Sequence, residues 1–109
     1  MWKKLIDVPD LIVQRGYVLK FPAKYPFEDF VVMMVSGYPE GGNSLAAISL
    51  ITITGYKAGI NPYVLFPQEV HPYGTLTGDW LIKNWSKWVW PEGDVNDVWV
   101  KEALDASVL

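Results

Sequence analysis

Residues 79–89 of the chain read DWLIKNWSKWV, and this stretch decides the fold class because no other segment has a clear helical pattern. Leu81, Trp85 and Trp88 recur at the spacing that places side chains on one face of an α-helix. The polar side chains of the segment fall largely on the opposite face, and they are Lys83, Asn84, Ser86 and Lys87. The pattern predicts one amphipathic helix over residues 79–89 that packs its tryptophan face on a sheet.

The residues at the borders of this segment carry signals for the two ends of a helix. Thr77 or Asp79 can supply the N-terminal cap or balance the helix dipole. Pro91 cannot continue a helix and therefore marks its end. We expect Trp80 and Trp90, which flank the apolar stripe, to be partly exposed, because one stripe cannot bury every tryptophan in this region.

A β-hairpin is expected in the middle of the chain. Residues 29–36 (DFVVMMVS) are rich in β-branched and aromatic side chains, as in a well-buried strand. Residues 38–43 (YPEGGN) form the strongest turn signal, and residues 45–54 (LAAISLITIT) end in β-branched residues. The two runs are therefore predicted to pair, although the Ala46–Ala47 pair leaves the first residue of the second strand open.

Shorter strands are expected around this hairpin. Residues 11–13 are apolar, and residues 14–16 can turn the chain into a strand over residues 17–21. Further strands are expected over residues 63–66 and 97–100. Because most strands follow one another through short turns, we predict an α+β fold, a mostly antiparallel β-sheet covered by the helix, in a single domain of residues 1–109.

Composition limits the classes of function. The chain has 109 residues, half of them apolar, and a formal net charge of −3, which fits a globular protein and argues against nucleic-acid binding. It has no cysteine, and Asp7, Pro9 and Asp10 interrupt any apolar core of a signal peptide. No uncharged stretch is long and apolar enough to span a bilayer. We therefore expect a cytoplasmic protein without a membrane partner.

The search for catalytic chemistry favours a protein without enzymatic activity, cofactor or metal. His71 is the only histidine, and no nucleophile motif accompanies it, so a polar loop residue is the simpler interpretation. A calcium loop that starts at Asp94 or at Glu92 lacks the required glycine at its sixth position. One histidine without cysteine makes a zinc site improbable, and no glycine-rich nucleotide motif is present.

Acidic and aromatic side chains gather after the predicted helix. Residues 89–109 hold five acidic side chains and one basic one. This acidity is typical of a solvated surface, but it also fits a patch that attracts a basic partner. Exposed tryptophan beside acids is the composition of a protein-binding hot spot, and it can also stack sugars. The residues expected to bind a partner are Trp90, Glu92, Asp94 and Asp97.

Several segments together resemble a family of bacterial immunity proteins. They are residues 25–30 (YPFEDF), 55–64 (GYKAGINPYV), 79–89 and 91–100 (PEGDVNDVWV). The family is the one numbered forty-five among the immunity proteins of polymorphic toxin systems, and the similarity extends over most of the chain. The resemblance implies a protein that binds a cognate toxin domain and blocks it in the producing cell. It implies no catalytic residues, and an acidic inhibitor suits a basic toxin.

Other classes of function stay open at this point. A small β-rich adaptor or a self-assembling structural protein from a mobile element would associate with itself without any partner. A small-ligand-binding module would use the tryptophans to line a pocket, and its ligand would raise the melting temperature. The sequence does not decide between a monomer and a homodimer.

Overall fold

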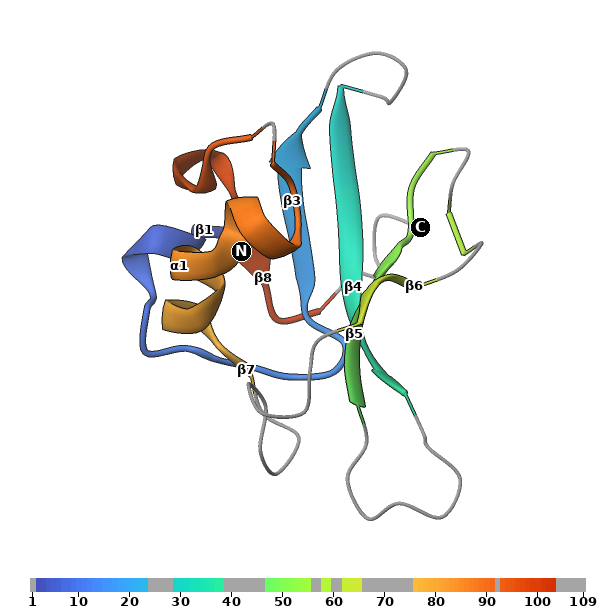
Figure 1. Ribbon diagram of the computed structural model, residues 1–109, viewed down its shortest axis with the longest axis horizontal. Coiled ribbons are helices and arrows are strands. Elements are labelled where there is room, and N and C mark those ends of the chain that lie inside the picture. Colours follow the sequence, from blue (N-terminus) through green and yellow to red (C-terminus); the bar gives the residue numbers. More distant parts are fainter. Residues whose placement is uncertain are drawn as a thin grey trace.

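The computed structural model describes residues 2–23, 29–38, 47–55, 58–59, 62–65, 76–91 and 93–103. Within them the chain forms one α-helix, short 3-10 helices and two antiparallel sheets, so it is an α+β protein as predicted (Figure 1). The helical segments are η1 (Leu5–Asp7), α1 (Gly78–Trp88) and η4 (Val95–Asp97). The strands are β1 (Lys3–Lys4), β2 (Ile12–Val13), β3 (Val18–Pro22), β4 (Phe30–Tyr38), β5 (Ala47–Thr52), β6 (Pro62–Leu65), β7 (Leu76–Thr77) and β8 (Trp99–Lys101).

The larger sheet is built around the predicted hairpin. Its strand order is β1-β8-β3-β4-β5-β6, and every neighbouring pair is antiparallel. β4 and β5 pair in one continuous register, from Met33 opposite Thr52 to Tyr38 opposite Ala47. The hairpin strands are therefore confirmed, and the described part of the second one runs from Ala47 to Thr52. The turn predicted over residues 38–43 lies mostly outside the described residues.

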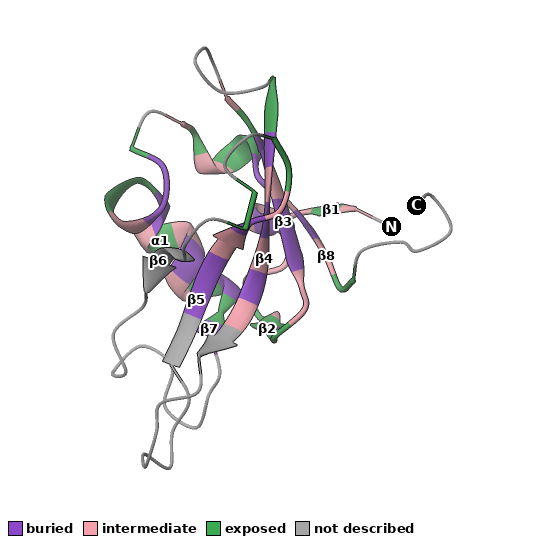
Figure 2. Cartoon of the chain, turned by 90° about the vertical axis from the view of Figure 1, so that its right-hand side faces the viewer, coloured by how far each residue is buried: buried purple, intermediate pink, exposed green. Residues whose placement is uncertain are grey.

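One face of this sheet forms the hydrophobic core. Val31, Met33 and Val35 alternate along β4 and are buried, because successive residues of a strand point to opposite faces. α1 lies on that side of the sheet and buries Leu81 and Trp85 against it (Figure 2). The predicted arrangement of one amphipathic helix on an antiparallel sheet is confirmed.

The helix keeps nearly the bounds that its sequence indicates. It has 11 residues, and none of the described helices is long and apolar enough to cross a membrane. The indole of Trp85 meets the ring of Phe21 edge-on, with the ring centroids 5.2 Å apart. Trp88 is only partly buried and packs against the core from its margin, beside Trp80 at 6.0 Å between ring centroids. Trp80 is partly exposed, as expected.

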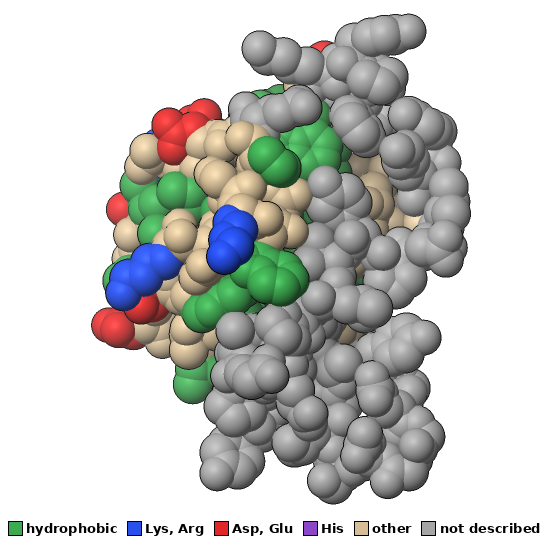
Figure 3. Space-filling model, in the orientation of Figure 1, with side chains coloured by type: hydrophobic (Ala, Val, Ile, Leu, Met, Phe, Trp, Pro, Cys, Tyr) green, Lys and Arg blue, Asp and Glu red, His purple; other side chains and the backbone are tan. Residues whose placement is uncertain are grey.

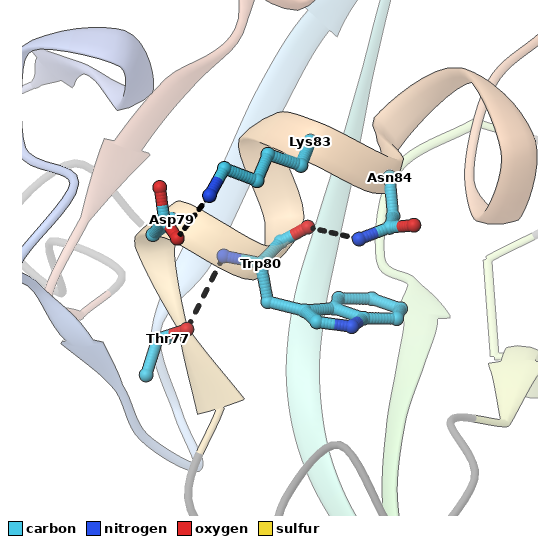
Figure 4. A network of polar contacts seen from close by, with 5 residues as sticks. All are labelled: Thr77, Asp79, Trp80, Lys83 and Asn84. Atoms are coloured by element: carbon cyan, nitrogen blue, oxygen red, sulfur yellow. Dashed lines mark hydrogen bonds and ion pairs between the residues drawn. The ribbon is translucent and has the colours of Figure 1, made fainter.

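Polar contacts fix the first turn of α1 (Figure 4). The backbone N–H of Trp80 donates to the hydroxyl oxygen of Thr77 at 3.2 Å, so Thr77 is the N-cap. Asp79 forms an ion pair with Lys83 one turn later, at 3.1 Å. The side-chain amide of Asn84 donates to the carbonyl oxygen of Trp80 at 2.9 Å. Both residues named from the sequence therefore act at the helix start, each in its own role.

Replacing Thr77 with alanine is expected to lower the free energy of unfolding by about 1 kcal/mol. The change leaves the N–H of Trp80 without its side-chain acceptor. Urea unfolding followed by circular dichroism measures the effect, and Thr77→Ser, which keeps the hydroxyl, should stay close to the parent protein. Equal stability of the alanine and serine variants would show that this cap contributes little.

The strands around the first turn are present, and one strand prediction near the other end of the chain needs correction. The turn at residues 14–16 is present, with the N–H of Tyr17 donating to the carbonyl of Gln14 at 3.0 Å. The strands on its two sides belong to different sheets, because β2 pairs with β7 whereas β3 lies between β8 and β4. The predicted strand over residues 97–100 is wrong at its start. Asp97 belongs to η4, and β8 begins at Trp99.

Candidate partner-binding site

Trp90 lies in the core, and the expectation that it is partly exposed is wrong. Only 7% of its surface is accessible. The N–H groups of Val89 and Trp90 both approach the carbonyl oxygen of Trp85, at 2.8 and 3.1 Å, and this turns the chain back over the end of α1. The turn brings the indole to the ring of Phe21, with centroids 5.1 Å apart. Trp90 therefore supports the segment that follows it and offers little of its own surface to a partner.

Gly93 rests directly on this buried indole. Its N–H donates to the carbonyl oxygen of Trp90 at 3.2 Å. A Cβ atom at Gly93 would lie 2.8 Å from Cδ1 of Trp90, so the contact leaves no room for a side chain. The close approach fixes the point at which the acidic segment leaves the core.

The short helix η4 then holds the acidic side chains in place. Asp94 is its N-cap, and one carboxylate oxygen accepts from the backbone N–H of Asn96 at 2.9 Å and from its side-chain amide at 2.8 Å. The N–H of Asp97 donates to the carbonyl oxygen of Asp94 at 3.0 Å. The N–H of Leu5 donates to the carbonyl oxygen of Val98 at 2.9 Å and so ties this turn to η1. The backbone that carries both aspartates is thus held by hydrogen bonds.

Asp94 and Asp97 are both exposed, and neither forms an ion pair with any residue that the structure describes. Acidic side chains lie at the upper left of the view in Figure 3, at the end of the molecule where η4 lies in Figure 1. Glu92, the third predicted acid, lies outside the described residues. We call Gly93, Asp94, Asn96 and Asp97, with Trp90 beneath them, the acidic corner.

The acidic corner offers negative charge and hydrogen-bond acceptors on a fixed backbone. Such groups recognise cationic or hydrogen-bond-donating side chains of another molecule. Across the described ranges, no group of three or more histidine, cysteine, aspartate or glutamate residues lies together as a metal site would require. His71 lies outside these ranges.

The structure also gathers residues that the sequence analysis did not single out. On the sheet face away from α1, the ammonium groups of Lys4, Lys20 and Lys101 lie over aromatic rings. These residues come from both ends of the chain and from β3, and only the strand pairing brings them together. No local sequence pattern marks such a group, because its members are far apart along the chain.

Fold and surface together define a small α+β protein in which a buried tryptophan supports an exposed acidic turn. The family model described as Immunity protein 45 matches residues 5–100, from η1 to β8. The chain belongs to this family of immunity proteins, which confirms the resemblance noted in the sequence. Neither a curated protein nor a solved structure matches the chain.

Proposed function

We propose that the protein binds a cognate bacterial toxin domain and neutralises it in the cytoplasm of the producing cell. The observation that carries this proposal is the match to Immunity protein 45 over residues 5–100. Protection by this route is a binding event that requires neither catalysis nor a cofactor. In this proposal the whole chain acts as one domain, and its target is a toxin of a polymorphic toxin system.

The acidic corner is the part of the surface that we assign to the toxin. Asp94 and Asp97 are exposed and have no ion-pair partner among the described residues, so their charges are available to a basic surface. Glu92 adjoins them in the sequence and adds to the same charge. Complementary charge increases the association rate and disfavours wrong partners. Trp90 contributes from below, by holding Gly93 and the turn in position.

Capture of the partner tests the function itself. The tagged protein serves as bait in a lysate of the bacterium that produces it, and mass spectrometry identifies what is bound. We expect the C-terminal domain of a large secreted protein, and co-expression of the immunity protein with that domain should restore growth. Recovery of the bait's own copies alone would favour the self-assembling alternative and would contradict the proposal.

Charge reversal at the acidic corner tests the site. The double variant Asp94→Lys and Asp97→Lys is expected to weaken toxin binding about tenfold or more, mainly through slower association. The salt dependence of the association rate should also fall, because salt screens the attraction between the two aspartates and a basic toxin, and the variant lacks this attraction. Surface plasmon resonance at two salt concentrations measures both effects.

The control for this experiment changes the net charge by the same amount elsewhere. Asp10 and Glu102 are exposed acids on other parts of the chain, and their replacement by lysine should leave the affinity close to that of the parent. If both double variants weaken binding equally, total charge and not the acidic corner governs the interaction. If neither does and both proteins fold, the toxin binds a different surface.

A further inference from the structure

The face of the larger sheet that points away from α1 carries a second recognisable surface. Val31, Met33 and Val35 point into the core, so Phe30, Val32 and Met34 point to the other side. α1, η1 and η4 contact one another and pack with the core, and none of the described helices covers the opposite face. Phe30 is 51% exposed there and so offers apolar surface to solvent.

Strand register places lysines and tryptophans side by side on this face. Lys4 of β1 lies opposite Trp99 of β8, and Trp99 lies opposite Lys20 of β3. Residues directly opposite each other in paired strands project to the same face. Lys101, two residues after Trp99, lies opposite Val18 and belongs to the same face.

Each of these lysines has its ammonium group over an aromatic ring. Lys4 Nζ lies 5.5 Å from the ring centroid of Trp99. Lys20 Nζ lies 4.6 Å from that of Trp2 and 5.7 Å from that of Phe30. Lys101 Nζ lies 5.8 Å from the ring centroid of Trp2. These are cation–π distances, so the rings hold the positive charges in place without neutralising them.

No carboxylate compensates this charge within the described part of the chain. None of the described strand residues that alternate onto this face is acidic, and none of the three lysines forms an ion pair with a described residue. The protein as a whole has a formal net charge of −3, so this face differs in sign from the overall charge of the chain. We call this surface the basic-aromatic face, and its residues are Trp2, Lys4, Lys20, Phe30, Trp99 and Lys101.

We propose that the basic-aromatic face docks an acidic, apolar-containing segment of a second protein. The ammonium groups keep N–H donors for carboxylates, and the partly exposed rings offer apolar contact area beside them. The lysine side chains are already ordered by the rings, which lowers the entropy lost on binding. This inference does not depend on the proposed function, because the face is made of other residues than the acidic corner and has the opposite charge.

Charge decides between this occupant and two others. A two-fold dimer through this face would bring three lysines against the same three lysines of a second copy, which is repulsive. A nucleic acid would be attracted by the three lysines, but the protein has a net negative charge. The rest of the surface would therefore repel the many phosphates of a nucleic acid. A short acidic protein segment meets the face without that cost.

Titration with a defined probe tests the proposal on the full chain. The probe is a fluorescently labelled peptide of alternating glutamate and leucine, and fluorescence anisotropy measures its binding at low salt. We expect saturable binding that shifts the indole N–H signals of Trp2 and Trp99 in nitrogen–proton correlation spectra. Lys20→Glu should weaken binding about tenfold, whereas Lys20→Arg should retain it. Lys87→Glu on α1 is the matched control and should leave the affinity unchanged.

Three outcomes would overturn the proposal. One is the absence of any shift at Trp2 and Trp99 on titration with the peptide. Another is tighter binding of oligothymidylate than of the peptide, which would make the face a nucleic-acid site. The last is concentration-dependent dimerisation that Lys20→Glu alters, which would make the face a contact between copies of the chain. Lys20→Gln replaces the glutamate variant if thermal melting shows that the latter does not fold.

Discussion

Replacing Trp90 with alanine is expected to lower the free energy of unfolding by about 3–5 kcal/mol. The side chain is 7% exposed and packs on Phe21, so its removal leaves a cavity in the core and also takes away the support of Gly93. A typical domain has about 5–15 kcal/mol of stability in total, so this loss is large. Chemical unfolding followed by tryptophan fluorescence or circular dichroism measures it.

The same variant separates two roles for Trp90. A tryptophan that contacts a partner from the surface would lose affinity on truncation while the free protein kept its stability. The buried side chain predicts a different result for Trp90→Ala. The free protein loses stability, and toxin binding weakens only because the acidic corner is no longer held in position. Trp88→Ala, at a partly exposed position, should cost clearly less. If Trp90→Ala kept its stability but lost affinity for the toxin, Trp90 would contact the toxin directly and this prediction would be wrong.

Parts of the fold with local signals were predictable. The helix was expected over residues 79–89 and is found as Gly78–Trp88, because its apolar spacing and the cap at Thr77 are visible in a few neighbouring residues. The central hairpin was equally visible, since its strands are long and rich in β-branched side chains. β1, β2 and β7 have two residues each, too few for any periodicity. They form only because they pair with strands far away in the sequence; Lys3, for example, lies opposite Val100.

The candidate site shows the same division between local and distant causes. The exposure of Asp94 and Asp97 follows from their charge, and their role in toxin binding stays a prediction. The burial of Trp90 depends on the turn of the chain at the carbonyl of Trp85, whereas its position beyond the apolar stripe of the helix suggested partial exposure. The basic-aromatic face depends entirely on strand register. Sequence patterns therefore located the acidic side chains after the helix, but neither the packing that holds them nor the lysines gathered by strand pairing.

Replacing Gly78 with alanine is expected to lower the free energy of unfolding by about 1–3 kcal/mol, although alanine is the better helix former. Gly78 is the first residue of α1, and a Cβ atom there would lie 2.6 Å from the carbonyl oxygen of Val8 and 3.3 Å from that of Pro9. Both neighbours are backbone atoms, which cannot rotate away as the end of a side chain can. Relief of the clash requires the whole segment to move.

That movement would break the contacts that attach the helix start to the N-terminal segment. The N–H of Gly78 donates to the carbonyl oxygen of Leu11 at 2.8 Å, and the N–H of Asp79 donates to that of Pro9 at 2.9 Å. Helix propensity alone favours alanine by about 1 kcal/mol, so the sign of the measured change decides which effect dominates. Ser86→Ala, at an exposed position of the same helix, is the control and should stabilise the protein slightly. Urea unfolding of both variants measures the two changes. If Gly78→Ala also stabilised the protein, the backbone at Val8 and Pro9 would have to move aside easily, which would contradict the prediction. If only Ser86→Ala stabilised it, the close contact at Gly78 would be rigid, as expected.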